Sequence, residues 1–261
     1  MSEMLLLLDV GNTNIKCGFA NEDGVSSSYV MPTDNSATAD SLGLTLCGFA
    51  RHAGIPPEDV TGVGISSVSP PLNPRIAEAC ERYFGHPARF VPETIPVPLE
   101  NRYARPHEVG ADRLTAAFAA RRLSAAPAVI AVDFGTATTF DCVVGNAFVG
   151  GLICPGLMTS LRALSKDTAK LPHIALTPGD GTLNIGVSTA ECINQGFLFG
   201  FADMVEGVAG RLKKHLGEGT EVIATGGFAH KLAPLCPCFT QVRSDLLLEG
   251  LRVMTLAAKA S

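Results

Sequence analysis

A chain of 261 residues suits one large domain or two of roughly 125 residues, and 46% hydrophobic against 17% charged residues is enough for a packed core. The net charge is −5, Lys and Arg never cluster beyond a pair, and aromatic residues make up only 6%, so we expect no nucleic-acid partner. The apolar start at Met4–Leu8 is too short for a signal peptide, and no window approaches the roughly 18 apolar residues of a membrane span, so we expect a cytoplasmic protein.

Short strands and helices alternate in the first half of the chain. Apolar runs bounded by Gly-Asn and Asp-Gly turns predict strands, and apolar residues at helical spacing predict helices. The predicted elements are strands at Met4–Leu8, Ile15–Ala20 and Val25–Met31, a helix at Ser41–Ala53, a strand at Thr61–Ser67, and helices at Pro71–Phe84 and Asp112–Leu123. Residues 92–109 hold four prolines and little periodicity, so we expect an ordered functional loop or a crossing segment there.

The second half repeats this order. Its predicted elements are strands at 128–133, 138–144 and 147–153, helices at 157–169 and 188–216, a strand at 221–225 and a last helix at 244–258. Each half therefore holds a strand, an acidic Gly turn, two more strands and a helix, which indicates an internal duplication. We expect two lobes, at residues 1–122 and 123–261.

Eight cysteines are scattered along the chain, mostly in apolar runs where Cys acts as a small hydrophobic residue. Cys236 and Cys238 are the only close pair, and without CxxC spacing or a nearby cluster of His we expect no zinc site. Reduced thiols are a better interpretation than disulfides for a chain without an export signal.

The turn DVGNT at 9–13 carries the first candidate for a function. Asp9 ends a buried apolar run, where an unpaired carboxylate is costly. Gly11 and Asn12 can adopt positive φ and present backbone N–H groups, Thr13 and Asn14 add short donors, and Lys16 adds a cation. A carboxylate beside such donors suits Mg²⁺ and a polyphosphate, although a hairpin turn capped by Asp9 explains this segment equally well.

A second copy of this turn, DFGTATTFD at 133–141, favours the polyphosphate interpretation. Two such turns facing one another would line a cleft that binds a nucleotide between lobes. Gly226 and Gly227, which follow the strand at 221–225, would let backbone approach a flat group such as adenosine, although such a pair is usually only a turn.

The paired turns resemble those of the acetate and sugar kinase/Hsp70/actin superfamily, and the full set of motifs resembles the type III pantothenate kinases. The matching stretches, in the family's order, are DVGNTNIKCG (9–18), ISSVSP (65–70), EVGADR (108–113), DFGTATTFD (133–141), GGLICPGL (150–157), STAECINQG (188–196) and ATGG (224–227). Ala116 and Ser69 depart from the family's usual Asn and Val. The resemblance implies an α/β fold of duplicated ribonuclease H-like, actin-like ATPase lobes, with mixed sheets flanked by helices.

Asp112 opens a predicted helix, and its ordinary role there would be to accept hydrogen bonds from free N–H groups and complement the helix dipole. The resemblance implies instead that GADR binds pantothenate and that this Asp is the catalytic base. Phosphoryl transfer passes through a loose transition state, so a carboxylate with a pKa near about 4 can serve if it lies within hydrogen-bond reach of the alcohol.

The resemblance also implies roles for other residues. The implied pantothenate contacts are Tyr103, Gly110, Ala111, Asp112, Arg113 and Thr189. The implied ATP and phosphate contacts are Asp9, Val10, Gly11, Asn12, Thr13, Asn14, Ile15, Lys16 and Thr136. Asp133 would hold a monovalent cation, K⁺ or NH₄⁺, and Asp9 would hold Mg²⁺ through the phosphates. Structural alternatives stay open, with Tyr103 as a half-buried aromatic residue and Thr189 as a helix N-cap.

The leading hypothesis is an enzyme that converts ATP and pantothenate into ADP and 4′-phosphopantothenate, the first committed step towards coenzyme A. The resemblance implies a homodimer with the site at its interface. A non-catalytic regulatory protein on the same fold is one alternative, because some relatives are described as transcriptional accessory factors. An actin- or Hsp70-like ATP-driven assembly is another. The joint presence of Asp9, Asp112 and Asp133 favours catalysis.

Overall fold

The computed structural model describes residues 3–166 and 174–260, which form two units. Unit 1 takes in the chain up to Leu99, residues Ala104–Ala119 and the chain from Asp245 onward. Unit 2 takes in Glu100–Tyr103 and Ala120–Ser244. The expected lobe boundary at residues 122 and 123 stays a prediction, but the last helix belongs with the first sheet and not with the second half of the chain.

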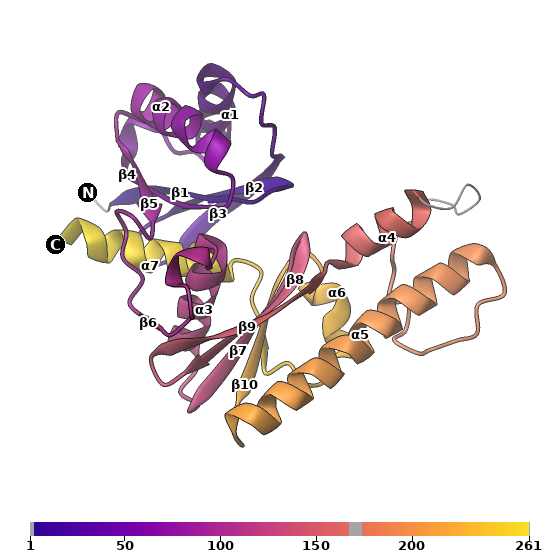
Figure 1. Cartoon of the computed structure of the whole chain (residues 1–261). Helices are drawn as coiled ribbons and strands as arrows, with labels where there is room; N and C mark the ends of the chain where they lie inside the picture. Colours follow the sequence, from indigo (N-terminus) through magenta and orange to yellow (C-terminus); the bar gives the residue numbers. More distant parts are fainter. Residues whose placement is uncertain (1–2, 167–173, 261) are drawn as a thin grey trace. The chain divides into compact units, whose positions relative to one another are not determined.

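Unit 1 is built on a five-stranded mixed sheet with the order β3-β2-β1-β4-β5 (Figure 1). Its strands are β1 (Met4–Val10), β2 (Asn14–Ala20), β3 (Val25–Pro32), β4 (Val60–Ser67) and β5 (Ala88–Val91). Its helices are α1 (Ala39–His52), α2 (Asn73–Phe84), α7 (Leu246–Ala260) and the first part of α3 (Ala111–Leu123), with short 3₁₀ helices at η1 (Pro57–Asp59), η2 (Pro70–Leu72) and η3 (Pro106–Glu108). Strand β1 runs antiparallel to β2 and parallel to β4, so it is the central strand.

The run of four leucines in β1 is explained by helices on both faces of this sheet. Leu6 and Leu8 pack in a core with residues of α1 and α2, and Leu5 and Leu7 pack in a second core with residues of α7. Because successive side chains of a strand point to opposite faces, a strand covered on both sides has no polar alternation. Figure 1 shows α1 and α2 on one side of the sheet and α7 on the other.

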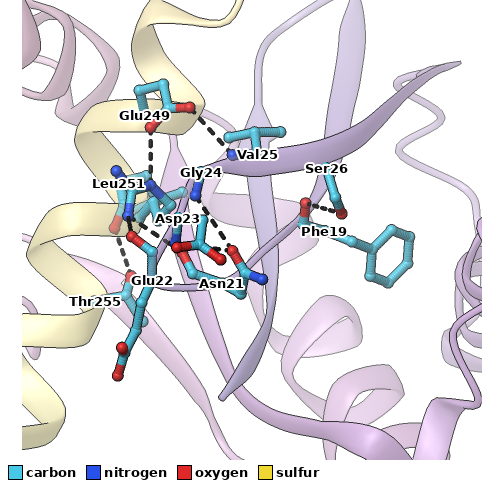
Figure 2. A network of polar contacts seen from close by, with 11 residues as sticks. Phe19, Asn21, Glu22, Asp23, Gly24, Val25, Ser26, Glu249, Leu251 and Thr255 are labelled. Carbon is cyan, nitrogen blue, oxygen red and sulfur yellow. Dashed lines mark hydrogen bonds and ion pairs between the residues drawn. The ribbon is translucent and has the colours of Figure 1, made fainter. Parts of the chain in front are cut away.

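Helix α7 lies very close to the sheet because the strands beneath it carry glycine. A Cβ at Gly64 of β4 would lie 2.1 Å from Oγ1 of Thr255, and one at Gly18 of β2 would lie 2.8 Å from Cδ1 of Leu248. Polar contacts add to this packing, since Oε1 of Glu249 accepts a hydrogen bond from the N–H of Val25 at 3.1 Å (Figure 2). The first unit therefore depends on the C-terminal residues for one of its two cores.

Unit 2 repeats the same opening on a six-stranded mixed sheet with the order β11-β10-β7-β8-β9-β6. Its strands are β6 (Glu100–Asn101), β7 (Ala128–Phe134), β8 (Ala137–Val144), β9 (Ala147–Pro155), β10 (Glu221–Gly226) and β11 (Gln241–Val242). Its helices are α4 (Leu157–Lys166), α5 (Thr189–Leu216) and α6 (Ala229–Leu232), followed by the 3₁₀ helix η4 (Ala233–Leu235). One core joins the sheet to α4, α5 and α6.

The expected α/β class with mixed sheets flanked by helices is confirmed. All strands and helices predicted above occur, with ends that differ by a few residues; residues 167–169 of the predicted helix at 157–169 lie outside the described part. Among the described helices, none has the length and hydropathy needed to cross a membrane. The eight cysteines are free thiols.

Candidate functional site

Asp9 is the next-to-last residue of β1 in unit 1 and lies in a row with side chains from both neighbouring strands. Its Cα pairs with that of Lys16 on β2 and with that of Ser66 on β4, so the three side chains share one face of the sheet. Ser66 is fully buried, and its hydroxyl has no hydrogen-bond partner among the described residues. The row places a carboxylate, a cation and a hydroxyl at the end of the central strand.

The turn after Asp9 is held by hydrogen bonds rather than by unusual backbone angles. The N–H of Gly11 donates to the carbonyl of Asn14 at 3.0 Å, and Oγ1 of Thr33 donates to the carbonyl of Gly11 at 2.7 Å. The expectation of positive φ at Gly11 and Asn12 is wrong, because neither residue adopts it. The close approach of Asn14 O, 3.0 Å from a Cβ at Gly11, explains the glycine instead.

The residues around this turn differ in what they can offer a nucleotide. Val10 and Ile15 are fully buried, so only their backbone atoms remain for such a role. Asn12 and Asn14 are exposed and Thr13 is half-buried. Polar side chains are therefore presented at the turn itself, and the apolar ones beside it anchor the turn in the core.

Lys16 is part of an ion pair with a residue that the sequence analysis did not single out. Its Nζ lies 2.8 Å from Oδ1 of Asp245, the residue just before α7. Asp245 is half-buried and follows Ser244 in a stretch without a motif, so only the packing of α7 on the first sheet shows its position. The Lys16 ammonium is thus held against the first sheet by the carboxylate of Asp245.

Asp112 lies at the start of α3, also in unit 1. Its Oδ1 accepts a hydrogen bond from the N–H of Arg113 at 2.7 Å, which is the ordinary role of a carboxylate in the first turn of a helix. Burial raises the pKa of the Asp112 carboxyl, and hydrogen bonding and the charge of Arg113 oppose this rise. A half-buried carboxylate with a raised pKa is also what a general base requires.

Glycine at position 110 makes room for the Asp112 carboxylate. A Cβ at Gly110 would lie 2.4 Å from Oδ1 of Asp112 and 3.3 Å from Cγ1 of Val68. The N–H of Val68 in turn donates to the carbonyl of Val10 at 3.0 Å. Unit 1 therefore brings the GADR segment and the first acidic turn together through Val68 of the ISSVSP stretch.

Both sequence neighbours of Asp112 are buried. The two residues that depart from the family pattern, Ala116 and Ser69, are also buried. Ala111 and Arg113 are 6% and 8% exposed, so Arg113 is not a surface residue of its helix. Ala116 is buried in α3, and the hydroxyl of Ser69 donates to Oδ1 of Asn35 at 3.3 Å.

Asp133 is the next-to-last residue of β7 in unit 2, as Asp9 is of β1 in unit 1. It pairs with Thr139 on β8 and with Thr225 on β10, and the N–H of Gly135 donates to the carbonyl of Ala137 at 3.0 Å. Thr136 is exposed, and its carbonyl accepts a hydrogen bond from Oγ1 of Thr159 at 2.6 Å. The second turn therefore repeats the first in strand position, and each is closed by a hydrogen bond from the glycine N–H, to a carbonyl three residues on in the first turn and two residues on in the second.

Gly226 has a structural role that the sequence analysis did not foresee. It has φ +90°, and a Cβ there would lie 2.3 Å from Oδ1 of Asp133. Gly227 has open space around its Cα. Gly226 is thus needed because any side chain at this position would occupy the space of the Asp133 carboxylate. Asp141, the second acidic residue of DFGTATTFD, is fully buried and accepts a hydrogen bond from Oγ1 of Thr139 at 3.0 Å.

Tyr103 and Thr189 both lie in unit 2. Tyr103 is half-buried, follows β6 and lies with its ring 6.2 Å from that of Phe148. Thr189 is exposed at the first position of α5, and the N-cap is Ser188, whose hydroxyl accepts from the N–H of Glu191. The interpretation of Thr189 as the N-cap is therefore wrong, and its hydroxyl is not needed to begin the helix.

A bound Mg²⁺ fits this residue set only together with phosphate oxygens. Among the described residues there is no group of three or more His, Cys, Asp or Glu side chains that could hold a metal ion. Mg²⁺ is commonly bound by one or two carboxylates together with substrate phosphates and water, and Asp9 is a carboxylate of that kind.

Comparison with known proteins shows the family of this chain. The family model described as type III pantothenate kinase matches residues 5–211. A type III pantothenate kinase of Oleidesulfovibrio alaskensis is 54% identical over 255 residues, which cover 97% of each chain.

Two solved structures show the fold. A ROK family glucokinase from Streptomyces griseus, in complex with glucose and AMPPNP, aligns over 99% of this chain and 100% of its own at 16% identity and a TM-score of 0.56. A Campylobacter jejuni protein described as a Baf family transcriptional activator aligns over 98% and 100% at 15% identity and a TM-score of 0.58. The expected kinase-like fold is confirmed. From its sequence and its matched length, the chain belongs to the type III pantothenate kinase family.

Proposed function

We propose that this chain transfers the γ-phosphoryl group of ATP to the 4′-hydroxyl of pantothenate, giving 4′-phosphopantothenate, the first step of coenzyme A biosynthesis. Family membership over the whole chain supports the reaction. The observation that carries the mechanism is the link through Val68 between the Asp9 turn and the GADR segment with its half-buried Asp112.

Asp112 is the base in this proposal. Its carboxylate accepts the proton of the attacking hydroxyl late in the transfer, when the bond to the leaving group is largely broken. Arg113, Gly110 and Ala111 shape the pantothenate site, and Tyr103 is proposed as a further pantothenate contact on the strength of the family resemblance. Arg113 brings a planar group of donors that suits the carboxylate of pantothenate.

ATP binding uses the two acidic turns. Asp9 would hold Mg²⁺, which when bound neutralises charge on the transferred phosphoryl group. The segment from Val10 to Lys16 supplies backbone and side-chain donors for phosphate oxygens. Asp133 would hold a monovalent cation, K⁺ or NH₄⁺, and Thr136 would contact ATP.

Release of ADP tests this function against its two alternatives. We expect ADP only when pantothenate is present, and faster release with K⁺ or NH₄⁺ than with Na⁺, measured in an enzyme-coupled assay. ADP release without pantothenate would contradict the proposal and favour an ATP-driven assembly. Absence of release under every condition would favour a regulatory protein; the net charge of −5 already opposes direct contact with DNA.

We also propose a cytoplasmic homodimer whose second copy covers an apolar surface of unit 2. Ile185 and Val187 are 94% and 90% exposed, and Ile153 on β9 is 64% exposed. Ile185 and Val187 lie four and two residues before the exposed Thr189, the implied pantothenate contact, whose hydroxyl does not cap the helix. Large exposed aliphatic side chains next to a functional residue are typical of an interface that completes a site.

A mixed dimer tests whether the site is shared. We expect Asp112→Asn and Thr189→Ala homodimers to have little activity. A purified heterodimer of the two variants should regain about half of the wild-type turnover per dimer, because one of its two sites then has both native residues. A heterodimer no more active than its parents, or a monomer by light scattering, would contradict the shared site.

A further inference from the structure

The ion pair between Lys16 and Asp245 joins the candidate ATP turn to the last helix of the chain. Nζ of Lys16 and Oδ1 of Asp245 are 2.8 Å apart, and 25% and 42% of the two side chains is exposed. Both residues belong to unit 1. Because a partly exposed pair contributes little to folding stability, stability alone is a weak reason for this contact.

Asp245 is held in place by the residues that follow it in α7. Leu248, Glu249 and Arg252 lie three, four and seven positions further on, so they share one face of the helix. A side-chain nitrogen of Arg252 donates to the carbonyl of Glu22 at 2.8 Å, and Glu249 accepts from the N–H of Val25 (Figure 2).

These contacts fasten α7 to β2 and to the turn that follows β2. Leu248 packs against Gly18, which lies two residues after Lys16 on the same strand. The backbone at Asp245 therefore has a position that the packing of α7 fixes independently of the pair with Lys16.

We propose that Asp245 is a positioning residue for ATP binding, in that its carboxylate holds the Lys16 ammonium beside the Asp9 turn for contact with the triphosphate. This inference rests on the proposed function, in which Lys16 contacts the phosphates. An ammonium has three donors, so one can stay on Asp245 while the others bind phosphate oxygens. Without the carboxylate, the flexible four-carbon side chain loses a fixed contact, so more of its ordering is left to the binding of ATP.

Steady-state kinetics of Asp245→Ala test the proposal. We expect KM for ATP to rise about two- to fivefold, the size expected for loss of one partly exposed ion pair, with kcat and KM for pantothenate nearly unchanged. Asp245→Glu keeps the charge and should recover part of the affinity. The control is Glu3→Ala, which removes an ion pair of similar exposure, with Lys259, at the far end of α7 and should leave KM for ATP unchanged.

A double-mutant cycle decides whether Asp245 acts through Lys16. Lys16→Met should raise KM for ATP, and Asp245→Ala should add nothing in that background. An equal rise in both backgrounds, or no rise in either, would overturn the proposal. If Lys16→Met leaves KM for ATP unchanged while pantothenate is still phosphorylated, the inference fails and the proposed function stands. If the wild-type chain does not phosphorylate pantothenate, the proposed function itself fails.

Discussion

Replacement of Asp112 by Asn is expected to lower kcat by about 10²- to 10⁴-fold, the range for loss of a general base, while pantothenate still binds. The amide cannot take the proton of the attacking hydroxyl, but it is isosteric and can still accept the hydrogen bond from the N–H of Arg113. The variant should therefore lose most of its turnover while its affinity for pantothenate, measured by calorimetry, stays close to that of the wild type. Loss of turnover and pantothenate binding together would indicate that Asp112 only stabilises the first turn of α3.

The same variant should change stability in a way that depends on pH. Burial raises the pKa of Asp112, so the folded state holds this proton more tightly than the unfolded state does. The resulting stability is fully present below about pH 4 and is lost as the pH rises through the raised pKa. Because Asn does not ionise, Asp112→Asn should match the wild-type Tm in acid and exceed it at neutral pH.

Asp40 is a matched control, since it also lies in the first turn of a helix. Its pKa is lowered, first by a hydrogen bond from Tyr83 and then by one from Arg82. Its contribution to stability is therefore present above its unfolded pKa and is lost as the pH falls. Asp40→Asn should lower Tm at neutral pH and keep turnover. A lower Tm for Asp112→Asn at every pH would contradict the account of its burial.

Replacement of Gly226 by Ala is expected to destabilise the protein by about 2–5 kcal/mol, from strain at positive φ and from overpacking against Asp133. The alanine would have φ +90° and a Cβ 2.3 Å from Oδ1 of Asp133 and 2.6 Å from the N of Phe134. Thermal unfolding followed by circular dichroism should show a markedly lower Tm.

Gly227→Ala is the control for this prediction, because no atom lies within 4 Å of a Cβ at that position and its φ is not positive. Its Tm should stay close to that of the wild type. Equal losses in the two variants would show that the Asp133 carboxylate does not require Gly226. If Asp133 holds the monovalent cation, any folded Gly226→Ala protein should also lose its activation by K⁺.

Most of the fold could be predicted because its main elements carry strong local signals. The four leucines of β1 and the apolar run of β7 are long enough to identify a buried strand. Strands β6 and β11 have two residues each and β5 has four, too few for a periodic pattern, and they were missed. The packing of α7 on the first sheet depends on pairs such as Gly64 and Thr255, which no local pattern connects.

The candidate site was predicted where a motif fixes a residue at the end of a strand or helix. Asp9, Asp133 and Asp112 lie in such places. Two details were not predicted, because they depend on hydrogen bonds that the local sequence does not determine. One is the backbone angles of Gly11 and Asn12, and the other is the choice of Ser188 over Thr189 as N-cap. Ser66 and Asp245 were missed because strand pairing and helix packing, not spacing, place them beside Asp9 and Lys16.

The most direct test of the central claim is to identify the product by phosphorus and proton NMR after ATP, Mg²⁺, K⁺ and pantothenate are incubated with the enzyme. The account predicts one phosphoryl group on the 4′-hydroxyl of pantothenate for each ADP formed, and far less product in the same time when Asp112→Asn replaces the wild type. Recovery of unmodified pantothenate together with free phosphate would contradict it.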